Sequence, residues 1–149
     1  MKVIALVTQK GGTGKSSLAV SLAVAAQEQG LKPYVLDLDP QRTATSWFER
    51  REAKGPEVTA LNAGQVPAAL DALRRQSCDI VVIDTPGADA PGTSAAMQAA
   101  DLCLIPARPS IADIEATRPT VRSLMKLNRE YAFVLNQCPP GRTIRTNDA

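Results

Sequence analysis

The stretch QKGGTGKSS, residues 9–17, constrains the fold more than any other part of the sequence. It follows an unbroken apolar run, KVIALVT, and precedes a segment whose apolar residues recur at four-residue spacing. A glycine-rich turn between a fully apolar strand and an amphipathic helix is typical of parallel sheets covered by helices. We therefore predict a strand at Lys2–Thr8 and a helix from about Lys15 to Gln29.

The same alternation continues along the chain. Apolar runs predict further strands at Pro33–Leu38, Val58–Leu61, Asp79–Asp84, Leu102–Pro106 and Tyr131–Asn136. Helical patterns cover Thr43–Ala53, Val66–Gln76 and a region from Ser110 to about Arg129, which begins with a capping-box spacing (Ser110, Asp113) and which Pro119 must kink or split. This order predicts a doubly wound α/β fold with a mostly parallel sheet, helices on both faces and ligands at the carboxyl ends of the strands.

Length and composition agree with one such domain. The chain has 149 residues, of which 44% are hydrophobic and only 3% aromatic, so its core must be aliphatic. We expect residues 1–138 to form the domain and residues 139–149 to be a flexible tail. Because Thr146 or Asn147 could cap a further helix, we expect the C-terminal part of the domain to be missing from this chain.

The cysteines and the hydropathy exclude several classes of protein. Cys78, Cys103 and Cys138 show no C-x-x-C spacing and there is no histidine, which argues against a zinc site and against a disulfide framework. We expect all three to be buried thiols in a reducing compartment. The sequence shows neither a signal peptide nor an apolar run of about 20 residues, so we expect a cytoplasmic protein without membrane attachment.

The glycine-rich turn itself predicts a phosphate site. Successive backbone N–H groups at a helix N-terminus attract an anion, and Gly11, Gly12 and Gly14 let the backbone approach it closely. In the pattern G-x-x-x-x-G-K-[ST], the lysine (Lys15) reaches the β- and γ-phosphates and the hydroxyl (Ser16) binds Mg²⁺.

One position of that pattern fails, because Gln9 stands where the first glycine belongs and a further lysine, Lys10, follows it. Carboxylates nevertheless lie where phosphate chemistry needs them. Asp84 ends an apolar strand and can hold the water shell of the magnesium. Asp37 and Asp39 end another strand at alternate positions, so that one can address the metal shell while the other orients an attacking water.

Three motifs in this order, QKGGTGKSS, LDLDPQ and VVIDTPG, resemble the ParA/MinD class of deviant Walker ATPases, and the ParA-type partition branch most. The resemblance covers nearly the whole chain. It implies a P-loop NTPase fold that binds ATP or ADP with Mg²⁺. It also implies a role for Lys10, which would cross a dimer interface to the phosphates bound by the other subunit.

The resemblance carries over to individual residues. The residues that match the phosphate loop are Gly11, Gly12, Thr13, Gly14, Lys15, Ser16 and Ser17. The implied catalytic residues are Lys10, Lys15 and Asp39, and the implied metal residues are Ser16, Asp39 and Asp84. The first switch segment contains DPQ (39–41), Asp84 matches the second Walker aspartate, and TPG (85–87) begins the second switch segment. Asn136 matches a strand-end residue that reads adenine, with a turn-forming asparagine as the alternative.

The resemblance further implies a slow, partner-stimulated ATPase that is a homodimer when ATP is bound. Such a protein binds DNA without sequence preference, becomes nucleoid-associated, and partitions plasmid or chromosomal DNA with a ParB-like adaptor. The alternatives are an ATPase that positions a chemotaxis or secretion complex, and a nucleotide-binding switch with negligible turnover. An iron–sulfur carrier is disfavoured because Cys103 and Cys138 lack a glycine-rich context.

Basic residues suggest where DNA would bind. Arg118, Arg122, Lys126 and Arg129 recur at intervals of four, four and three residues, so they lie on one face of the predicted helix. Contacts to DNA phosphates need only such a basic surface. The alternative is an ordinary solvated helix face, and the net charge of +2 does not decide between the two.

Overall fold

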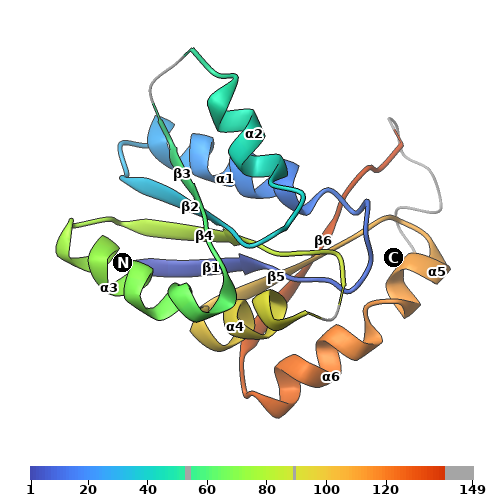
Figure 1. The fold of residues 1–149 in the computed structure, drawn as a ribbon. Coiled ribbons are helices and arrows are strands. Elements are labelled where there is room, and N and C mark those ends of the chain that lie inside the picture. Colours follow the sequence, from blue (N-terminus) through green and yellow to red (C-terminus); the bar gives the residue numbers. More distant parts are fainter. Residues whose placement is uncertain (53–54, 89, 140–149) are drawn as a thin grey trace.

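Six parallel strands form one sheet in the computed structural model, which describes residues 1–52, 55–88 and 90–139 (Figure 1). The strands are β1 (Lys2–Leu6), β2 (Pro33–Asp37), β3 (Glu57–Ala60), β4 (Ile80–Asp84), β5 (Leu102–Ala107) and β6 (Glu130–Leu135). Their order across the sheet is β3-β2-β4-β1-β5-β6, and every neighbouring pair is parallel. All strand carboxyl ends therefore meet at one edge.

Helices cover both faces of this sheet. They are α1 (Lys15–Glu28), α2 (Thr43–Glu49), α3 (Val66–Arg75), α4 (Pro91–Ala99), α5 (Ile111–Glu115) and α6 (Arg118–Lys126), with a short 3-10 helix at Ala63–Gln65. In Figure 1, α1 and α2 lie on one side of the sheet, and α3, α4 and α6 lie on the other. The predicted doubly wound α/β fold is confirmed.

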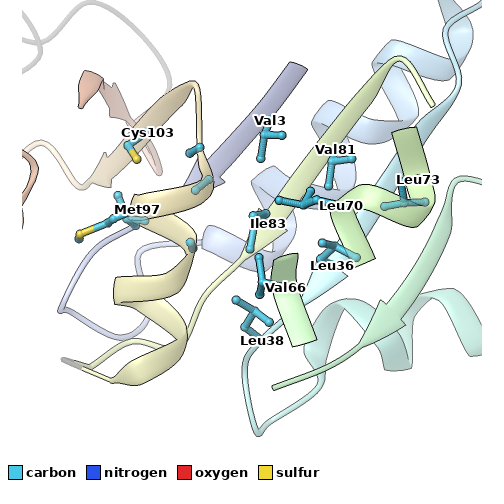
Figure 2. Close-up of a cluster of buried hydrophobic side chains, with 14 of the residues drawn as sticks. Val3, Leu36, Leu38, Val66, Leu70, Leu73, Val81, Ile83, Met97 and Cys103 are labelled. Atoms are coloured by element: carbon cyan, nitrogen blue, oxygen red, sulfur yellow. The ribbon is translucent and has the colours of Figure 1, made fainter. Parts of the chain in front are cut away.

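The core explains why the central strands read as unbroken apolar runs. In β4, Val81 and Ile83 pack into the cluster beneath α3 and α4, whereas Val82 packs into the cluster beneath α1. Figure 2 shows the first cluster, in which Val66 and Leu70 of α3 contact the strands. A strand that is buried on both faces needs apolar residues at every position.

Three elements differ from those predicted. Helix α4 has no counterpart among them. The helix predicted for Ser110 to Arg129 is two helices, and Pro119 is the second residue of α6, where its missing N–H has no intrahelical partner to lose. Helix α2 ends at Glu49, because the chain must turn back there to pair β3 with β2. The predicted end of α2, Ala53, lies outside the described residues.

The structure also bears on what we expected of the cysteines, of membrane-spanning segments and of the C-terminal residues. Cys78 and Cys103 are buried as predicted, but Cys138 is exposed, because it follows the last strand and nothing in the described chain packs over it. No helix in the described ranges is long and apolar enough to cross a membrane. The predicted tail, including Thr146 and Asn147, lies outside the described residues beyond residue 139.

Candidate functional site

The loop between β1 and α1 lies at the carboxyl edge of the sheet (Figure 1). Gly12 and Gly14 have φ angles of 74° and 87°, a left-handed conformation in which glycine is much the most favourable residue. Gly14 is also the N-cap of α1 and supplies no side-chain hydrogen bond. The first N–H groups of the helix lack intrahelical partners, so they can point at an anion held by the loop.

Lys15 is the buried cation of this loop, with only 6% of its surface exposed. Its Nζ donates to the Lys10 carbonyl at 3.3 Å. Burial lowers the pKa of Lys15, while the charges of Asp84 and Asp39 oppose that shift. The ammonium group therefore lies beside the loop backbone and near two carboxylates.

Asp84 is fully buried at the end of β4. Within the described chain, neither of its carboxylate oxygens has a hydrogen-bond partner of normal geometry. Burial raises the pKa of Asp84 to about 7, although the neighbouring Ser16 hydroxyl and Lys15 oppose the shift. A buried carboxylate with both oxygens unpaired, next to a hydroxyl, fits the water shell of a magnesium ion.

The donor set fits magnesium bound chiefly through a phosphate group. In the described ranges, no group of three or more histidine, cysteine, aspartate or glutamate side chains could hold a metal by itself. Mg²⁺ usually keeps several waters and takes one or two protein ligands together with substrate phosphates. Ser16 and Asp84 fit that arrangement.

Asp37 and Asp39 differ in what they contact. Asp37 is buried, and its carboxylate accepts hydrogen bonds from the Asp39 N–H at 3.1 Å, the Thr45 N–H at 2.9 Å and the Thr45 hydroxyl at 2.8 Å. Asp39 is only partly buried and accepts from the Gln41 N–H at 2.9 Å. Asp37 therefore anchors the segment, and Asp39 is the carboxylate left at the mouth of the site.

The end of β6 reaches the same loop. The Asn136 amide donates to the Thr13 carbonyl at 2.8 Å, and the Gln137 amide donates to the Gly12 carbonyl at 3.0 Å. Sequence reasoning missed Gln137, since a single glutamine after a strand carries no signal. An adenine contact by Asn136 stays a prediction. Because the side-chain NH2 of Asn136 donates to the loop, the side-chain oxygen is the group left to contact adenine.

Lys10 has a partner that the sequence did not predict. Its Nζ lies 2.7 Å from Oδ1 of Asp113, and Nε of Arg108 lies 3.5 Å from the same oxygen. Ser110 caps α5, as predicted, by accepting from the Asp113 N–H at 3.2 Å. A complete capping box would also have a hydrogen bond from the Ser110 N–H to the Asp113 carboxylate. That bond is absent, because the Asp113 carboxylate instead accepts the Ser110 hydroxyl at 2.6 Å and pairs with Lys10.

The predicted basic face is divided. Arg118 forms an exposed ion pair with Glu115, and Arg129 lies beyond the end of α6, where it donates to the backbone carbonyls of Gln98 and Ala100. Arg122 and Lys126 have no ion-pair partner in the part of the chain that the structure describes. A DNA contact by these four residues stays a prediction.

Comparison with known proteins agrees with this geometry. Residues 4–146 match the family model of the CobQ/CobB/MinD/ParA nucleotide binding domain. The chain is 34% identical over 116 residues to Protein ParA of Rhizobium radiobacter, covering 76% of this chain and 51% of that protein. It is also 34% identical over 146 residues to the Maintenance of carboxysome distribution protein A of Gloeobacter kilaueensis, covering 93% of this chain and 64% of the relative.

Among solved structures, a putative plasmid partition protein of Borrelia burgdorferi bound to AMPPNP has the same fold, with a TM-score of 0.81 at 19% identity. The superposition covers 98% of this chain and 80% of that one. The chain thus spans between about half and two thirds of the length of the first two relatives. The loop, the strand-end aspartates and the family match lead to one conclusion: this chain belongs to the CobQ/CobB/MinD/ParA family of nucleotide-binding domains, within its ParA/MinD class.

Proposed function

We propose that the chain is the nucleotide-binding part of an ATPase that binds MgATP and closes into a two-fold dimer around it. In this proposal it hydrolyses ATP slowly until a partner protein stimulates it. Membership of the ParA/MinD class supports ATP as the nucleotide. The buried lysine and the unpaired carboxylate at the loop support a site for phosphates and magnesium.

Each residue has a distinct task in this proposal. The N–H groups of the loop and Lys15 bind the phosphates, and Ser16 and Asp84 hold the magnesium with its water. The ion, when bound, neutralises charge on the β- and γ-phosphates. Asp39 orients the attacking water, because of the two aspartates at the carboxyl end of β2 it is the less buried, and it accepts one hydrogen bond where Asp37 accepts three.

The observation that carries the proposal is the contrast between the two lysines of the loop. Lys15 is buried and interacts with the charges of Asp84 and Asp39, whereas the Lys10 side chain is 36% exposed and forms an ion pair with Asp113. An exposed cation beside a phosphate loop is suited to bind phosphate on a second subunit, as an arginine finger does. A nucleotide shared in this way makes the dimer depend on ATP.

Two kinds of cargo are candidates for what the ATPase moves or positions. Similarity to Protein ParA supports partitioning of plasmid or chromosomal DNA, with non-specific DNA binding, nucleoid association and a ParB-like adaptor. Similarity over 93% of the chain to a carboxysome distribution protein supports positioning of a cargo other than DNA. Binding of purified adaptor proteins from the same genome, scored by stimulated ATP turnover, separates the two.

The test is the oligomeric state in solution with ATP and Mg²⁺, measured by sedimentation for the unaltered chain, Lys10→Ala and Asp39→Ala. Asp39→Ala should accumulate a dimer because it binds ATP without hydrolysing it, and Lys10→Ala should stay monomeric. Turnover without a partner should be slow, and its complete absence would favour a nucleotide-binding switch. A chain that binds ATP yet stays monomeric in all three forms would refute the dimer.

A further inference from the structure

The Asp113 carboxylate binds several groups at once. Its Oδ1 lies 2.7 Å from Nζ of Lys10 and 3.5 Å from Nε of Arg108, while its Oδ2 accepts the Ser110 hydroxyl at 2.6 Å. The Asp113 side chain is only 9% exposed, whereas those of Lys10 and Arg108 are 36% and 42% exposed. The Lys10 ammonium and the Ser110 hydroxyl lower the pKa of Asp113, so the carboxylate is charged near neutral pH.

This ion pair lies within one chain, and that has a consequence for the proposed dimer. Lys10 can contact either Asp113 of its own chain or a phosphate on another subunit, because one ammonium group cannot hold both positions. Dimerisation therefore has to break the Lys10–Asp113 pair. A ligand shifts such an equilibrium only by its differential affinity for the two states.

We propose that Asp113 is a positioning residue that holds Lys10 within its own subunit and so opposes dimerisation until ATP offers a stronger anion. This inference rests on the proposed function, since it assumes that Lys10 acts across a dimer interface. The γ-phosphate competes with a single carboxylate that already shares its charge with Arg108. ATP therefore draws Lys10 away, and the chain without ATP stays a monomer.

Arg108 makes the exchange possible. A buried carboxylate left without a cation is strongly unfavourable, so Asp113 needs a substitute when Lys10 departs. Nε of Arg108 is buried without a hydrogen-bond partner in the described chain, and it already lies within ion-pair distance of Oδ1. Arg108 therefore takes over Asp113 once Lys10 leaves, and it favours the dimer.

The two residues thus have opposite effects, and this distinguishes the proposal from a merely structural role. Asp113→Asn removes the competing anion and should lower the dimer dissociation constant with a non-hydrolysable ATP analogue roughly 5- to 30-fold, because two lysines are released per dimer. Arg108→Gln leaves Asp113 without its substitute cation and should raise that constant. The double variant should resemble Asp113→Asn, because Arg108 acts only through Asp113.

The experiment measures dimerisation by sedimentation, together with ADP affinity and thermal unfolding of each variant. Glu115→Gln is the matched control, since it removes an exposed carboxylate from the same helix, where it pairs with Arg118. An Asp113→Asn chain whose dissociation constant equals or exceeds that of the unaltered chain overturns the inference and leaves the proposed function standing. An unaltered chain that does not dimerise with ATP overturns both.

Discussion

Asp37 and Asp84 are register partners at the carboxyl ends of β2 and β4, but their buried carboxylates differ in hydrogen bonding. Asp37 accepts three hydrogen bonds from the segment that follows it. Asp84 accepts none of normal geometry from the described residues, and burial raises its pKa to about 7. Asp37 therefore stabilises the segment after β2, whereas the Asp84 carboxylate remains available to a bound ligand.

The first prediction concerns how stability depends on pH. In the unfolded chain Asp84 ionises near 3.8, whereas in the fold it holds its proton up to about 7. Between those values the folded state binds more protons, so this group makes the ligand-free chain less stable as pH rises. Asp84→Asn removes that contribution, and between about pH 4 and about pH 7 it should gain roughly 2–4 kcal/mol relative to the unaltered chain.

Urea unfolding of both chains without metal or nucleotide, at several pH values across this window, measures the difference directly. Titrating groups that do not interact with Asp84 contribute equally to both chains and cancel, so the difference reports Asp84 together with the charges coupled to it, chiefly Lys15. Parallel stability curves for the two chains would mean that the Asp84 carboxylate is satisfied by the protein after all. Asp84→Asn should also lose magnesium-dependent ATP turnover, which checks that the same group serves the metal.

The second prediction concerns Asp37, which anchors the segment after β2. Asp37→Asn replaces a carboxylate that accepts three hydrogen bonds, one of which comes from the N–H of Thr45 in the first turn of α2. Hydrogen bonds to a buried charged group contribute about 1.5–3 kcal/mol, so the free energy of unfolding should fall by about that amount. Thr45→Val removes only the hydroxyl bond and should have a smaller effect. Equal and negligible effects of both changes on chemical denaturation would contradict the anchor.

Local patterns were sufficient to predict that the glycine-rich loop joins a strand to a helix and that Asp84 ends a strand. An apolar run that ends in an aspartate, and a glycine cluster before a helical pattern, carry their structural meaning within about ten residues. Because parallel strands share one carboxyl edge, residues from distant motifs could be placed together without knowing the strand order.

Interactions between distant segments could not be predicted in the same way. Helix α4 was missed because Ala95, Ala96 and Ala99 give little contrast between its buried and exposed faces. The partner of Lys10 was missed because Ser110 and Asp113 satisfy a local capping pattern, whereas the contact with Lys10 depends on how α5 lies beside the loop. The hydrogen bond of Gln137 to Gly12 likewise joins residues that lie 125 positions apart in the chain.

The third prediction concerns the close approach of the proposed second switch segment, which begins at Thr85–Gly87, to the glycine-rich loop. A Cβ atom added at Gly87 would lie 2.8 Å from the Gly11 Cα and 3.1 Å from the Gly11 nitrogen. Both contacts are with backbone, so Gly87→Ala must displace the loop, and overpacking of this kind costs about 1–3 kcal/mol. We expect ATP affinity, measured by calorimetry, to fall about tenfold or more.

Gly64→Ala is the matched control for this change. The added Cβ would lie 3.4 Å from the Asn62 side chain and would touch no part of the loop. It should leave ATP affinity unchanged. If Gly87→Ala also binds ATP normally, the loop does not depend on this close contact with the switch segment.

The last prediction separates the four basic residues proposed to contact DNA. Arg129 donates to the carbonyls of Gln98, in the last turn of α4, and of Ala100, which caps that helix, so Arg129→Ala should reduce thermal stability as well as any DNA affinity. Arg122 has no ion-pair partner among the described residues, so Arg122→Ala should leave stability unchanged.

If the α6 face binds DNA phosphates, Arg122→Ala should weaken binding to any DNA sequence and reduce the salt dependence by about one released counterion. The measurement is the affinity for a short duplex at several salt concentrations, with ATP present, and Arg75→Ala, which removes an exposed arginine from α3, serves as the matched control. An Arg122→Ala chain with unaltered affinity and salt dependence would assign the face to solvent and would place any DNA contact elsewhere on the protein.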